Sequence, residues 1–154
     1  WYNDSMKTGR RLILMAAGLL VLCSSSLAWI DGQMPINTSF GAALSTMVST
    51  ASNHSVTLNI SFLNQISMAA VLFVAGVIIL VASVLGSRII ALVSTILAVV
   101  ITLMWIIATG ISLDGFINHF AGLGTGTHLA LLGIIIALLA ILFPRLHWPG
   151  RSND

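Results

Sequence analysis

Charged residues are scarce in this sequence. Only 6% of its 154 residues are Asp, Glu, Lys or Arg, whereas 58% are hydrophobic. A soluble domain carries about 25% charged residues, because its surface needs polar cover against aggregation. The composition therefore excludes an ordinary soluble domain and predicts an integral membrane protein, with the lipid bilayer as a partner. The formal net charge of +2 is too small to indicate nucleic-acid binding.

Cysteine is nearly absent as well. The single residue, Cys23, excludes an intramolecular disulfide framework. It lies within an apolar run, where a thiol has little tendency to ionise, so nucleophilic catalysis is not indicated. We predict that the chain is not an enzyme and needs no cofactor.

Four apolar runs are long enough to cross a bilayer, which takes about 20 residues of helix. None of them contains Asp, Glu, Lys or Arg. We predict one all-α membrane domain over residues 1–154, with outer loops at 31–65 and 110–126. Its four transmembrane helices are expected at residues 12–30, 66–85, 89–109 and 127–143.

The basic residues predict the orientation of this four-helix bundle. With four spans, all of them fall on one side of the membrane: Lys7, Arg10, Arg11, Arg88, Arg145 and Arg151. The positive-inside rule makes that side cytoplasmic, so both termini are expected inside, in a multi-pass protein of the plasma membrane. The first run also resembles a cleavable signal peptide, with a basic start and a small-residue end. We expect it to be retained, because four spans put every basic residue on one face.

Tryptophans stand near the ends of the predicted spans. Trp29 and Trp105 lie near the outer ends, and Trp148 follows the last span. Since indoles favour the headgroup region, we expect these three side chains to be interface anchors.

The larger outer loop contains two patterns. Apolar residues at helical spacing in residues 40–48 predict a short amphipathic helix, on the membrane surface or against a partner. Alternating residues 56–62 predict a strand, with an irregular loop or an extension of the second span as alternatives. The Asn37, Asn53 and Asn59 glycosylation triplets are interpreted as incidental in a segment so rich in Asn, Ser and Thr.

Small residues recur at a spacing of four within the spans. Such pairs let helices approach closely, either inside a bundle or at a docking face, and the pattern leaves both open. The pairs are Ala82 with Gly86, Ser94 with Ala98, and Gly133 with Ala137.

A metal site on the outer side is a weaker hypothesis. Asp114, His119 and His128 fall within fifteen residues, and imidazole suits copper or zinc. Their spacing matches no tight ligand motif, and polar residues in a water-facing loop explain them equally. The nearby glycines at 122–126 lack the strand and lysine of a phosphate loop and are expected to form a tight turn.

The lack of ionisable side chains within the spans argues against proton relay or ion-coupled transport by this chain alone. The sequence therefore predicts a non-catalytic accessory, assembly or stabilising subunit, with other membrane protein subunits as partners. The alternative is a small self-associating channel or transport component lined by hydroxyls such as Thr95 and Thr102. An outer-face copper or zinc binder ranks below both.

Overall fold

The computed structural model describes residues 8–29, 34–52, 54–55, 61–108, 120 and 123–143, and this part of the chain is helical without strands. Its elements are α1 (Thr8–Ser24), the 3₁₀ turn η1 (Pro35–Asn37), α2 (Phe40–Ser52), α3 (Ser61–Gln65), α4 (Met68–Leu85), α5 (Arg88–Ala108) and α7 (Thr125–Leu142). The predicted all-helical class is confirmed for these residues.

Among the described residues, three helices are long and apolar enough to cross a membrane: α4, α5 and α7. They match the second, third and fourth predicted runs to within about two residues, as expected for helix boundaries. Local chemistry sets their ends. Ser67 caps α4 by accepting the Ala70 N–H at 3.2 Å, and Gly86 ends α4 in the left-handed conformation, with φ 72°.

The first predicted run is not one continuous helix, and the expectation of a helix over 12–30 is wrong at its C-terminal end. α1 stops at Ser24, and 3₁₀-type turns follow at residues 25–27. The serine run explains the end, because the hydroxyls of Ser24 and Ser25 donate to the carbonyls of Val21 and Leu22 at 2.6 and 2.7 Å. The indole N–H of Trp29 then donates to the Ser24 carbonyl at 2.7 Å.

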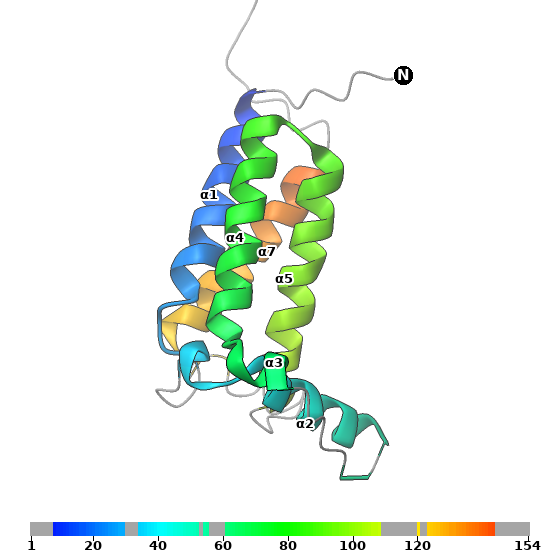
Figure 1. Ribbon diagram of the computed structural model, residues 1–154. Helices are drawn as coiled ribbons and strands as arrows, with labels where there is room; N and C mark the ends of the chain where they lie inside the picture. The colour runs from blue at the N-terminus through cyan, green and yellow to red at the C-terminus, as the bar shows by residue number, and fades with distance from the viewer. Residues whose placement is uncertain are drawn as a thin grey trace, which may run out of the picture.

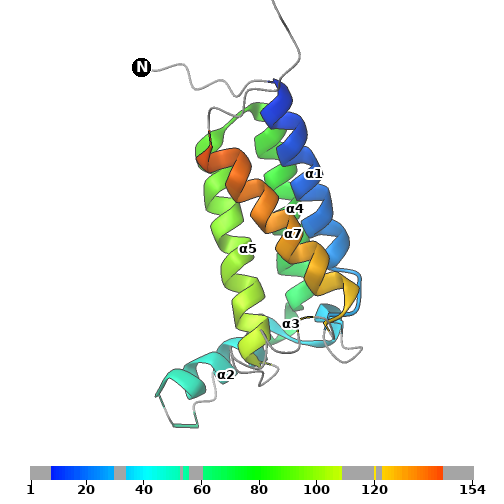
Figure 2. The ribbon, with the colours of Figure 1, turned by 180° about the vertical axis from the view of Figure 1, so that it is seen from behind.

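The four long helices α1, α4, α5 and α7 stand side by side (Figures 1 and 2). α1 packs against both α4 and α7, and α5 also contacts these two helices. We call the end with the first turn of α1 and the start of α5 the arginine end, because it carries Arg10, Arg11 and Arg88. The opposite end, where α7 begins, is the tryptophan end and holds Trp29 and Trp105.

Glycines allow α1 to approach its neighbours at backbone distance. A Cβ atom built on Gly76 of α4 would lie 2.9 Å from the Leu22 nitrogen and 3.1 Å from the Gly18 carbonyl oxygen. On the other side of α1, a Cβ on Gly133 of α7 would lie 2.9 Å from the Ala17 oxygen. Close backbone approach is how helices pack where lipid removes the hydrophobic drive.

The remaining small residues of the predicted pairs also lie in the interior. Ala82, Ala98 and Ala137 are fully buried, and Ser94 is nearly so. The structure thus places these residues between its own helices. Gly86 is buried at the turn between α4 and α5.

α2 is attached to the tryptophan end through the start of α4. Ser39 and Ser67 form an isolated antiparallel bridge, in which the Phe40 N–H donates to the Ile66 carbonyl at 2.7 Å and the Met68 N–H to the Thr38 carbonyl at 2.9 Å. From this attachment α2 runs obliquely past the end of the bundle (Figure 1). The helix predicted at residues 40–48 is therefore present.

The strand predicted at residues 56–62 is wrong where it can be compared. Ser61 and Phe62 begin the short helix α3, whereas residues 56–60 lie outside the described part of the chain. A lone strand has no edge to pair with, whereas a helical turn satisfies its backbone groups locally. α3 packs against α2 instead.

Candidate functional site at the tryptophan end

Two tryptophans form the centre of the tryptophan end. Trp29 and Trp105 are both 0% exposed, and their rings meet edge to face, with centroids 5.1 Å apart and an interplanar angle of 68°. This differs from the half-exposed interface anchors expected from the sequence, because the two indoles pack against each other inside the bundle. Trp148 lies outside the described residues.

The segment after α1 is bonded to the start of α7 around Trp29. The Gly124 N–H and the Thr127 hydroxyl both donate to the Trp29 carbonyl, the latter at 2.9 Å, and the Gly126 N–H donates to the Ala28 carbonyl at 2.9 Å. A Cβ atom on Gly126 would overlap the Trp29 ring. Gly124 and Gly126 thus let two segments about 100 residues apart share hydrogen bonds at backbone distance.

α2 covers this joint from the side of α5. Ala43 of α2 is fully buried in the same cluster as both tryptophans, and Phe40 and Leu44 pack against it. The cluster also includes Met68, Leu72, Met104 and Leu123. The Trp105 Nε1 is buried there without a hydrogen-bond partner in the described part of the chain.

His128, one of the three candidate metal ligands, is bonded into the loop before α7. Its Nδ1 lies 3.1 Å from the Gly124 carbonyl oxygen, and its Nε2 lies 3.1 Å from that of Phe120. The Phe120 ring meets the imidazole edge to face, with centroids 4.9 Å apart. Both ring nitrogens therefore face backbone oxygens. Asp114 and His119 lie outside the described residues, so the metal site stays a prediction.

The buried hydroxyl groups of the described residues all donate to backbone carbonyls. Thr95 and Thr102 bond within their own helix, to Ala91 at 2.7 Å and Ala98 at 2.8 Å. Ser94 instead bonds across helices, to the Ala75 carbonyl of α4 at 2.8 Å. The others are Ser24, Ser25, Ser83 and Thr127.

The arginine end has a different chemistry. Arg10 and Arg11 lie in the first turn of α1 and Arg88 begins α5, all three half-buried, and the Arg11 guanidinium packs over Gly86. Lys7, Arg145 and Arg151, which the orientation prediction also used, lie outside the described residues.

Sequence reasoning did not single out Gly18, Gly76 or the inward position of Trp29. Gly18 and Gly76 each lie inside an apolar run, and such a glycine indicates close helix contact without identifying the partner helix.

Comparison of the chain with models of known protein families, with curated proteins and with solved structures finds no match.

Proposed function

We propose that this chain is a non-catalytic accessory subunit that helps to assemble or stabilise a larger membrane protein complex. In this proposal α1 crosses the membrane together with α4, α5 and α7, which gives four transmembrane helices. The protein lies in the plasma membrane, and both termini face the cytoplasm. The packing of α1 between α4 and α7 supports its role as a span. Its 17 residues cover about 25 Å of the roughly 30 Å of hydrocarbon that a transmembrane segment crosses. In this proposal the residues between α1 and the buried Trp29 span the rest.

The main support for the proposal is that the buried hydroxyl groups of the described residues donate hydrogen bonds to backbone carbonyls. Channels and transporters line a path with polar groups that can contact the permeant species. In the described residues each buried Ser or Thr hydroxyl is instead bonded to a backbone carbonyl. Their hydroxyl protons are thus used within the bundle, as suits a structural subunit.

The same geometry weakens the channel alternative. A pore formed by self-association needs Thr95 and Thr102 on a surface between copies, yet they are 0% and 2% exposed inside a single chain. The exposed side chains of α5 are apolar instead, and they suit lipid or a neighbouring helix: Ile89, Ile90, Val93, Ile96, Leu97, Val100 and Leu103.

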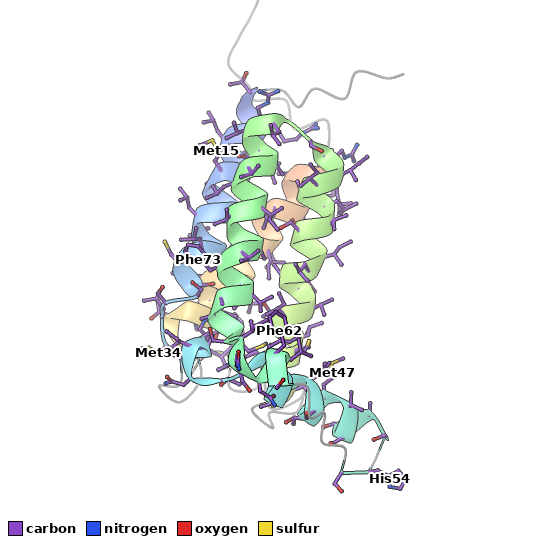
Figure 3. All side chains as sticks on the ribbon, in the orientation of Figure 1. Met15, Met34, Met47, His54, Phe62 and Phe73 are labelled. Carbon is purple, nitrogen blue, oxygen red and sulfur yellow. The ribbon has the colours of Figure 1, made fainter. Side chains whose placement is uncertain are left out.

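α2 provides the surface by which we expect the chain to contact its partner outside the bilayer. It contains no charged residue, and Phe40, Ala43 and Leu44 hold one side of it on the bundle. Met47 lies on the same apolar stripe one turn further along and is 36% exposed, and His54 follows beyond the end of α2, away from the bundle (Figure 3). An uncharged exposed helix face that projects from a rigid attachment suits a protein contact.

Affinity purification from the chain's native membranes tests this function. In mild detergent, a tagged chain should retain a larger membrane protein at a fixed ratio that survives changes of detergent and salt. Met47→Lys on α2 should reduce the retained partner about tenfold or more, because a lysine would be desolvated at the contact. Thr8→Lys, exposed at the arginine end, adds the same charge and should leave the ratio unchanged. A chain that retains nothing at fixed ratio would refute the proposal.

A further inference from the structure

At the arginine end, a cationic side chain from α1 lies over the turn between α4 and α5. A Cβ atom built on Gly86 would lie 2.6 Å from Nη2 and 3.2 Å from Nε of Arg11, so the guanidinium packs flat against this turn. Glycine suits the position because φ is 72°, and a side chain there would also displace the end of the Arg11 side chain. The fold thus places one positive charge beside this turn.

This positive charge is incompletely paired. The Nε of Arg11 is buried without a hydrogen-bond partner in the described part of the chain. None of the described residues is acidic, since the carboxylates of the sequence lie at positions 4, 31, 114 and 154. Nε is closed off by the surrounding protein, whereas neither Nη group is buried without a partner, so the Nη groups are the donors of Arg11 that an external anion would meet.

A second positive element starts at the same turn. α5 begins at Arg88, two residues after Gly86, and has no acidic residue in its first turn. The Ser87 hydroxyl accepts the Ile90 N–H at 3.4 Å, and the N–H groups before it have no intrahelical acceptor, as in the first turn of any α-helix. The N-terminal end of a helix carries partial positive charge, so its first turn adds to the charges of Arg11 and Arg88.

The surroundings of the turn are apolar. Leu85, just before Gly86, is 64% exposed, and Ile89, just after Arg88, is 75% exposed. Both belong to helices long and apolar enough to cross a membrane, and the turn joins them where such helices leave the hydrocarbon. A molecule with a phosphate beside acyl chains fits this combination of charge and exposed apolar surface better than a soluble anion does.

We propose that Arg11, Arg88 and the first turn of α5 bind the phosphate of one anionic phospholipid, whose acyl chains lie along Leu85 and Ile89. The guanidinium groups supply charge-assisted hydrogen bonds, and the position at the end of α4 and α5 places them at headgroup depth. This site requires only that α4 and α5 cross the membrane. It is independent of the proposed accessory role.

Native mass spectrometry of the purified full-length chain with added lipid tests the site. Phosphatidylglycerol should be retained about fivefold or more over zwitterionic phosphatidylcholine, as one tightly bound molecule. Arg11→Gln and Arg88→Gln should each weaken phosphatidylglycerol retention about five- to tenfold. Arg10→Gln is the matched control, since it removes the same charge from the neighbouring position of α1 and should change retention about twofold or less.

Three results would overturn the proposal. Equal losses for Arg10→Gln and Arg11→Gln would indicate diffuse attraction by the whole arginine end. Equal retention of the two lipids would show no preference for an anion. Displacement of phosphatidylglycerol by excess inorganic phosphate as readily as by more lipid would indicate a soluble-anion site. If Arg11→Gln lowers the folded yield, Arg88→Gln decides, because Arg88 stands at the first position of its helix.

Discussion

Trp29 is the residue on which the tryptophan end depends. Its ring packs against Trp105, its indole N–H donates to the carbonyl that ends α1, and its own carbonyl accepts from Gly124 and Thr127 at the start of α7. One residue therefore joins the end of α1, the start of α7 and α5. Substitutions that touch its ring should disturb all three.

Gly126→Ala should destabilise the protein by about 1–3 kcal/mol, because the added methyl group overlaps the Trp29 ring. Gly9→Ala is the matched control, since nothing lies within 4 Å of a Cβ at that position. It should be neutral or slightly stabilising, because alanine favours the helix. Unfolding in mixed micelles, followed by tryptophan fluorescence, measures both variants. Equal stabilities for the two would contradict the described joint.

Ser94 differs from the other buried hydroxyls of α5 because it bonds across to another helix. Ser94→Ala should cost about 0.5–1.5 kcal/mol, the range of interhelical hydrogen bonds in membranes. Thr102→Val removes a hydroxyl that bonds only within its own helix and should cost less. The same unfolding assay compares them. A larger loss for Thr102→Val would show that Ser94 does not link α4 and α5.

At the scale of elements, the close crossing of α1 and α4 organises the bundle. Around Gly76 the atoms nearest to a built Cβ include the Leu22 nitrogen and the Gly18 oxygen, which belong to the backbone of α1. Backbone atoms cannot turn aside as a flexible side chain can. A larger residue at position 76 must therefore move the whole of α1.

Gly76→Leu should consequently destabilise the bundle by about 3 kcal/mol or more, at the upper end of overpacking costs. Val81→Leu provides the control, because it enlarges a half-exposed side chain on the same helix. It should change the unfolding free energy by about 0.5 kcal/mol or less. If both variants unfold alike, α1 does not pack against α4 at Gly76.

The sequence predicts the elements better than it predicts their contacts. Uninterrupted apolar runs defined α4, α5 and α7, since a bilayer-length helix leaves a strong local signal. The end of α1 was not predicted because the 12–30 run stays apolar on both sides of the serines. In the structure the serine hydroxyls and the Trp29 indole donate hydrogen bonds to the last carbonyls of α1, where the helix ends. The inward position of Trp29 depends on Gly126, a pairing of segments about 100 residues apart that no local pattern reveals.

At the scale of the whole molecule, the proposed orientation places α2 outside the cell and the start of α1 inside. Single cysteines in a Cys23→Ala background test it, at Ser52→Cys on α2 and Thr8→Cys on α1, both exposed positions. In intact cells a membrane-impermeant maleimide should label Ser52→Cys, and should label Thr8→Cys only after permeabilisation. Labelling of both positions in intact cells, or the reverse pattern, would contradict the orientation.

The accessory role is the central claim for the molecule as a whole, and the native mass of the complex extracted from its own membranes tests it most directly. We predict a mass that contains a fixed number of copies of this chain together with at least one larger, different protein. Collision-induced release should then yield the intact chain from that assembly. A mass that is only one copy of the chain, or only a multiple of it, would contradict the claim.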